Sequence, residues 1–306
     1  MTILVAKTKI GLSNKQEQQV ISSLETKFGN KISAITCFLV MYNRPMATQN
    51  NVINFSENFP LLSSAPIVES VIDMRIASDV KWDEIALKKD LQNRLKDYPK
   101  IEELREFRYH VSAGQGSDQQ GKHKAEDLGC VGLKLSSADG FHIVQFNQGA
   151  FIFSRLKPYQ DWNQFTGEAL RLWKVYREIF RPVTVQRLGV RFINRIPVQS
   201  DFTDLGDYYN SAPKELAGLN WPQGGFFTHD VFQVPETDYA VNLNKTRVPP
   251  NGGDKEHGLV LDIDVYSQNP FTYTDEELKA HLNKMRWVKN KVFFTCITFK
   301  LLARFR

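Results

Sequence analysis

Apolar and polar side chains alternate along four stretches of the chain, which is the pattern of a half-buried β-strand. The four stretches are residues 67–76, 105–111, 186–196 and 259–267. Each has one apolar face and one charged face, so together they predict a one-sided sheet whose apolar face lies under helices. The polar positions of these stretches are Glu69, Asp73, Arg75, Glu106, Arg108, His110, Arg187, Arg191, Arg195, Asp262, Asp264 and Tyr266.

Three other stretches show the 3.6-residue spacing of amphipathic helices. Residues 79–99 place an apolar stripe on one side and end at a proline. That stripe consists of Trp82, Ile85, Leu91 and Leu95. Residues 161–180 carry a stripe of seven, Trp162, Phe165, Ala169, Leu172, Trp173, Tyr176 and Phe180, typical of a core helix rather than a cofactor site. A helix over residues 275–294 is predicted by the capping box of Thr274 and Glu277.

These elements predict an α+β fold, with long helices packed on one face of a mostly antiparallel sheet. Two pseudo-repeated halves are an added hypothesis, residues 60–182 and residues 183–306, the second ending in a long basic helix. At an offset of 116 residues, Arg75 corresponds to Arg191 and most flanking apolar positions also match. Residues 1–59 are interpreted as a leader and a linker, with Met46 as the natural start of the protein.

Composition and charge narrow the function classes. The formal net charge of +5 is unevenly distributed, because residues 1–45 carry six Lys/Arg and two Glu, while residues 278–306 carry eight Lys/Arg and no acid. The remaining 25 Lys/Arg and 32 Asp/Glu form an acidic body, which disfavours a dedicated nucleic-acid domain. Three scattered cysteines favour neither a disulfide framework nor a zinc site. The apolar run at residues 32–42 is too short for a membrane span, so we expect a cytoplasmic protein.

The arginines at every fourth position of residues 187–195 are the most conspicuous charged feature. The β-branched and aromatic residues around them favour a strand, on which they would stand ~13 Å apart. That spacing suits the phosphates of a single nucleic-acid strand, whereas acids on neighbouring strands would pair with the arginines instead. Both interpretations stay open, with ion pairing favoured. The candidate binding face comprises Arg187, Arg191, Arg195, Arg75, Glu69, Asp73, Arg108 and His110.

Most catalytic signatures are missing from the sequence. There is no phosphate-binding loop, no dinucleotide-binding glycine motif and no nucleophile elbow. Asp262 and Asp264 share one strand face and are weak candidates for Mg²⁺ ligands, and His110 is a weak candidate for a general base. The sequence therefore predicts no cofactor and leans against an enzyme.

Four segments, APIVESVIDMRI, the W-x-x-F helix, QRLGVRFINRI and KNKVFFTCIT, carry a resemblance to a family. Over residues 60–306 the chain resembles an uncharacterised family of sporadically distributed hypothetical proteins of bacteria and archaea. The resemblance implies no activity and no catalytic residues. The patchy occurrence of the family implies a place in mobile or defence gene cassettes.

Two function classes follow from these observations. The favoured hypothesis is a non-enzymatic interaction or regulatory protein, whose partner is a protein and in the first place a neighbouring gene product. The alternative is a nucleic-acid-binding protein with weak metal-dependent hydrolysis. Co-purification separates the two, because the first predicts a protein partner and the second a bound oligonucleotide.

Overall fold

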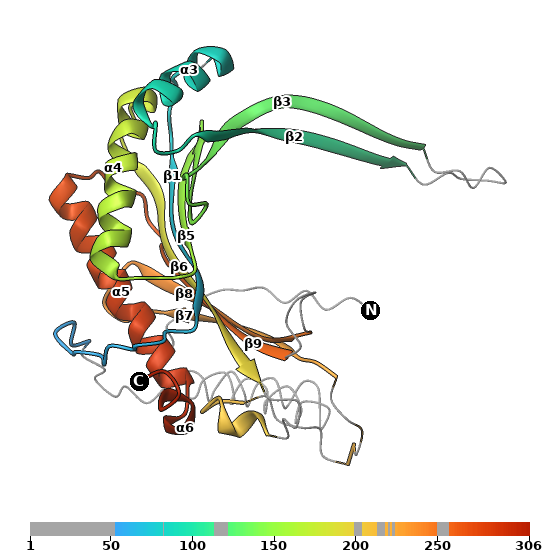
Figure 1. Ribbon diagram of the computed structural model, residues 1–306, viewed down its shortest axis with the longest axis vertical. Coiled ribbons are helices and arrows are strands. Elements are labelled where there is room, and N and C mark those ends of the chain that lie inside the picture. Colours follow the sequence, from blue (N-terminus) through green and yellow to red (C-terminus); the bar gives the residue numbers. More distant parts are fainter. Residues whose placement is uncertain are drawn as a thin grey trace, which may run out of the picture. The chain divides into compact units, whose positions relative to one another are not determined.

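A nine-stranded antiparallel sheet is the frame of the protein, seen in the computed structural model (Figure 1). The strands run in the order β2-β3-β4-β5-β1-β6-β9-β8-β7. Their bounds are β1 Ile67–Ile76, β2 Lys100–Ser112, β3 Lys122–Ser136, β4 His142–Asn147, β5 Ala150–Leu156, β6 Val185–Val198, β7 Phe227–Gln233, β8 Tyr239–Val248 and β9 His257–Ser267. Helices pack against this open sheet, so the predicted α+β class is confirmed.

The structure describes residues 53–81, 83–112, 122–198, 204–212, 218–219, 221, 224–249 and 257–306. Residues 53–306 form one compact unit. Three predictions, a leader over residues 1–45, a start at Met46 and a core position for Trp82, lie outside the described residues.

The strand order has an internal symmetry about the central pair β1 and β6. In the first half β1 pairs with β5, the last strand of the meander that follows it, and a long helix comes next. In the second half β6 pairs with β9, again the last strand of its meander, and a long helix follows. The two halves therefore share this order of strands and long helix, whereas the first also has helix α3 and an extra edge strand.

Two long helices, α4 (Trp162–Phe180) and α5 (Asp275–Cys296), lie along one face of the sheet (Figure 1). All seven members of the predicted aromatic stripe of α4 are buried. The indole Nε1 of Trp162 donates to Asn283 Oδ1 on α5, which ties the helices together over the sheet. The capping box of Thr274 and Glu277 begins α5 as predicted. None of the described helices is long and apolar enough to cross a membrane.

Helix α3 (Glu84–Arg94) buries a different stripe from the predicted one. Leu91 and Leu95 are buried, as expected, but Ile85 is 78% exposed and Leu87 takes its place. The prediction for Ile85 was wrong because six residues before Leu91 correspond to about 240° around a helix, whereas four correspond to about 40°. The side chain of Ile85 therefore points away from the sheet.

The hairpin of β2 and β3 departs from the one-sided pattern. Its outer part extends beyond the helices (Figure 1), and Phe107, predicted to face the core, is half exposed. An apolar face needs an element to cover it, and at this distance from the body of the sheet no described helix does so. The prediction for residues 105–111 was therefore wrong at Phe107. Ion pairs such as Arg105 Nη2 to Asp127 Oδ2 (2.8 Å) join the two strands here.

The basic side chains of α5 are largely used within the chain. Lys291 Nζ lies 3.0 Å from Glu57 Oε1, and Lys284 lies over the ring of Phe55. The ring of Trp287 contacts Phe55, and its Nε1 donates to the backbone oxygen of Glu57. The segment of residues 53–59, interpreted from the sequence as the end of a linker, thus lies against α5. A short helix, α6 (Phe299–Leu302), follows α5.

Candidate functional site

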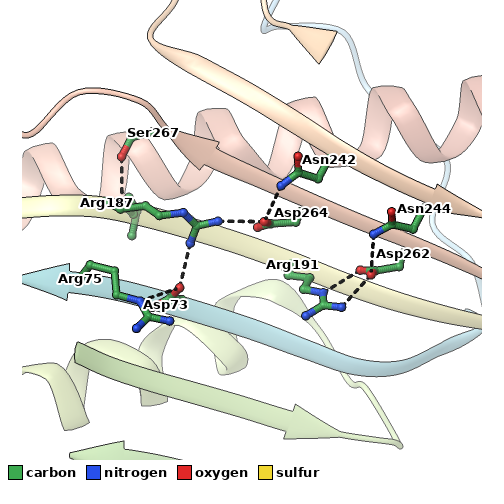
Figure 2. A network of polar contacts seen from close by, with 10 residues as sticks. Asp73, Arg75, Arg187, Arg191, Asn242, Asn244, Asp262, Asp264 and Ser267 are labelled. Carbon is green, nitrogen blue, oxygen red and sulfur yellow. Dashed lines mark hydrogen bonds and ion pairs between the residues drawn. The ribbon is translucent and has the colours of Figure 1, made fainter. Parts of the chain in front are cut away.

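The central ion pairs of the charged face connect strands β1, β6 and β9 (Figure 2). The guanidinium of Arg187 on β6 donates from Nη1 to Asp73 Oδ2 on β1 and from Nη2 to Asp264 Oδ2 on β9, both at 2.8 Å. One arginine therefore bridges three neighbouring strands. Ion pairing, the interpretation that the sequence favoured, is confirmed for this side chain.

Arg191, the next arginine along β6, makes a two-pronged contact with Asp262. Its Nε and Nη2 donate to Oδ1 and Oδ2 at 2.8 and 2.7 Å. Asn244 on β8 donates to Asp262 Oδ2 at 3.2 Å, and Asn242 donates in the same way to Asp264 Oδ2 at 3.3 Å (Figure 2). The aspartates of β9 are therefore held by arginines from one side and by amides from the other.

The local sequence of β6 explains how Arg187 reaches two acids. Gly189 lies on the same face of the strand, and an added Cβ there would stand 2.6 Å from Arg187 Nη1. The absence of that Cβ lets the arginine lie along its own strand, over Gly189. Asp73 on β1 and Tyr266 on β9 are the register partners of Gly189, and the guanidinium of Arg187 lies 4.9 Å from the Tyr266 ring. The glycine is thus a requirement of this ion-pair network.

Burial determines the electrostatics of the central acids. Burial raises the pKa of Asp73, and the nearby Arg75 and Arg187 offset part of that increase. Asp73 Oδ1 lies 3.1 Å from Arg75 Nε without an aligned hydrogen bond. The side chain of Asp262 is only 9% exposed, and its hydrogen bonds raise the pKa of Arg191. The two acids are therefore shielded from solvent and are stabilised by the neighbouring guanidinium groups.

The charge balance of this face limits what it would bind. A hollow of about 360 Å³ lies between β1 and β6, and its charged lining residues are Asp73, Arg75, Arg187, Arg191 and Asp264. Together with Asp262 they give three arginines and three aspartates. A surface that binds phosphates needs a positive surplus. The central arginines therefore provide no such surplus.

Other residues of the candidate binding face lie elsewhere. Arg108 and His110 are on β2, at the edge of the sheet and four strands away from β1. Glu69 lies opposite Ile193 and contributes little to the pKa of Arg191. The structure therefore does not gather the eight candidate residues into one site.

Arg195 has different surroundings from the other two arginines of β6. The side chain of Arg191 contacts Asp262 on β9. In the pairing of β6 with β9, Asp262 lies opposite the residue that follows Arg191 by two positions. The equivalent position for Arg195 is Gly258, where an added Cβ would stand 2.9 Å from the arginine Cζ. Arg195 also lines a separate cavity at the end of β6.

Metal binding finds little support among the described residues, which contain no cluster of three His, Cys, Asp or Glu side chains. Asp262 and Asp264, the weak candidates for Mg²⁺ ligands, each accept hydrogen bonds from a guanidinium. A cation there would have to displace the arginines first.

Sequence reasoning missed a partly buried lysine, Lys289, which lies on α5. Nζ of Lys289 is 4.1 Å from the centre of the Phe192 ring, and burial lowers the pKa of this lysine to about 7. The charged form is stabilised by the face of an aromatic ring. Lysine at that position continues the basic pattern of α5, so nothing in the sequence distinguishes it from its neighbours.

The edge strand β7 carries a second feature that the sequence did not reveal. It is the last strand in the order, and no described strand lies beyond it. Phe227, Val231 and Phe232 are 68%, 58% and 50% exposed. Edge strands are usually protected by charges or prolines, because unpaired backbone groups invite another strand. An edge with exposed apolar side chains that no described strand covers is therefore a candidate surface for recognition.

The ladder between β7 and β8 shows which backbone groups of β7 point outward. Arg247 N–H donates to the oxygen of Phe226, and Val234 N–H donates to that of Tyr239. Hydrogen-bonded pairs alternate in an antiparallel ladder, so residues 228, 230 and 232 also bond to β8. The N–H and C=O groups of residues 227, 229, 231 and 233 consequently point away from β8.

No protein-family model matches the chain, and no curated protein matches it either.

Proposed function

We propose that the protein acts without catalysis, by binding another protein whose extended segment adds a strand to β7. The observation that carries this proposal is the outer edge of β7, which combines outward backbone groups with exposed apolar side chains. Backbone hydrogen bonds would supply affinity, and alternate side chains would supply specificity, as in other cases of strand addition.

The geometry of β7 defines the chemistry of the partner. Phe227, His229 and Val231 share one face of the strand, because each lies two residues from the next. The added segment would be extended and would place apolar side chains beside Phe227 and Val231. The added segment would then bury the side chains of Phe227 and Val231, which are exposed in the isolated chain. The resemblance described above makes a neighbouring gene product the first candidate.

The nucleic-acid alternative has weaker support. Arg187 and Arg191 are engaged by carboxylates, and most basic side chains of α5 contact acids or rings of the same chain. Binding to phosphates would require these contacts to be exchanged. A protein partner at β7 requires no such exchange.

Val231→Pro tests the proposal. The N–H of residue 231 points away from β8, so proline there removes a donor for an added strand but no bond of the native ladder. Val231→Thr is the matched control, because it keeps the N–H and the β-branched shape. We expect tagged wild type and Val231→Thr to retain the same protein from the native host, and Val231→Pro to lose it at an unchanged melting temperature.

Two results would overturn the proposal. One is equal recovery of the partner by Val231→Pro. The other is the recovery of an oligonucleotide, detected by its absorbance ratio and by nuclease treatment, without any protein.

A further inference from the structure

A cavity of about 860 Å³ lies where β6 ends and the chain enters β1. Its walls are residues 63–68, residues 157–159, residues 195–197, His257 and part of the C-terminal segment from Leu301 to Phe305. The volume falls within the ~300–1,000 Å³ of typical small-molecule sites. The cavity shares no lining residue with β7, so it is separate from the proposed partner edge.

The described lining of this cavity combines basic with apolar side chains. Its ionisable side chains include Lys157, Arg195, Arg304 and His257, and no aspartate or glutamate is among the described lining residues. Its apolar side chains are Ala65, Ile67, Val68, Ile196, Leu301 and Phe305, joined by Tyr159 and three prolines. A concave, partly apolar site concentrates the field of its charges, so it attracts anions.

Two polar groups add to this picture. Nδ1 of His257 is buried and has no hydrogen-bond partner among the described residues, which is uncommon unless a ligand or water supplies one. The guanidinium of Arg195 also lines the cavity and lies beside Gly258, where an added Cβ would stand 2.9 Å from the arginine Cζ.

We propose that this cavity binds a small organic anion, a carboxylate, sulfonate or phosphate ester with an apolar body. The anionic group lies near Arg195, Lys157 and His257. The apolar body lies against Tyr159 and Phe305. A metal ion does not fit this lining, since His257 is its only His, Cys, Asp or Glu among the described residues.

The test uses 1-anilinonaphthalene-8-sulfonate as a probe, because it joins a sulfonate to aromatic rings and fluoresces when its surroundings become apolar. Titration of the folded full-length chain should give saturable binding of one probe per chain. Neutral N-phenyl-1-naphthylamine has the same rings without the sulfonate, and it should bind at least ~10-fold more weakly, the loss expected for one charge-assisted hydrogen bond.

Variants locate the site. Lys157→Gln changes an exposed side chain and should weaken binding of the sulfonate without altering the melting temperature. Arg195→Gln should weaken it at least ~10-fold. Lys174→Gln on the exposed side of α4 is the matched control and should change neither. Equal binding of both probes, or equal affinity in wild type and in the Lys157→Gln and Arg195→Gln variants, would overturn the proposal.

Discussion

The contact of Arg191 with Asp262 gives the sharpest test of how the charged face is held together. The side chain of Asp262 is 9% exposed, whereas that of Arg191 is 47% exposed. Removing the arginine by Arg191→Met leaves a buried carboxylate for which, among the described residues, Asn244 is the remaining side-chain donor. Removing the acid by Asp262→Ala leaves a guanidinium that water can reach. The two variants should therefore differ in cost.

The expected magnitudes follow from this asymmetry. Loss of one partner costs ~0–1 kcal/mol for exposed ion pairs and ~3–5 kcal/mol for buried ones. For this half-buried pair we expect Arg191→Met to lower the free energy of unfolding by ~1.5–3 kcal/mol and Asp262→Ala by ~1 kcal/mol. The double variant should cost less than the sum, with a coupling energy of ~1–2 kcal/mol.

Urea unfolding of the wild type, both single variants and the double variant measures this coupling energy. Arg105 and Asp127 on the β2–β3 hairpin form the control cycle, because their side chains approach to 2.8 Å but are 40% and 41% exposed. Their coupling should be smaller than that of Arg191 with Asp262, because both side chains are exposed to solvent. A coupling of Arg191 with Asp262 within the ~0.3–0.5 kcal/mol scatter of independent sites would refute the argument.

Two further predictions concern a glycine and a helix cap. Gly189→Ala should displace Arg187 and destabilise by ~1–3 kcal/mol. Gly167→Ala in α4 should instead stabilise by ~0.5–1 kcal/mol, because an added Cβ there meets no atom within 4 Å. Thermal melts of both glycine variants measure these effects, and equal effects would contradict the prediction. Hydrogen bonds from Thr274 lower the pKa of Glu277. The ionised Glu277 therefore stabilises the folded chain above the ordinary carboxyl pKa, and this contribution is lost as pH falls through the lowered pKa. The stability gap between wild type and Glu277→Gln should close at acid pH, and a constant gap would contradict this.

Most of the fold could be predicted from periodicity, because buried faces impose a regular spacing. The stripe from Trp162 to Phe180 is buried without exception, and the capping box of Thr274 begins α5 as expected. Prediction failed where an apolar residue lacks a covering element. Ile85 lies on the exposed side of α3, and Phe107 lies on the part of the β2–β3 hairpin that extends beyond the helices. Local sequence shows which residues alternate, but it does not show how far a helix extends over the sheet.

The sequence could predict the type of contact at the candidate site, but not which residues make each contact. Alternation on single strands indicated that arginines and acids share a face, and acids on neighbouring strands do pair with Arg187 and Arg191. The pairing of Arg191 with Asp262 depends on β6 lying next to β9, which strand alternation does not reveal. The same limit explains why Arg108 was grouped with residues four strands away from it. The supporting amides and the exposed edge of β7 likewise depend on the strand order.

The ion pairs also explain how the central strands keep their register. A one-residue slip of β6 against β9 would turn the arginines toward the helices, so the apolar pattern forbids it. A two-residue slip would keep every apolar side chain buried and is not excluded by that pattern. It would, however, separate Arg191 from Asp262, and in either direction one of the two arginines that pair with β9 would lose its acid. Charges that neutralise one another at the centre thus specify the sheet, which leaves its edge and its end cavity as the surfaces available for recognition.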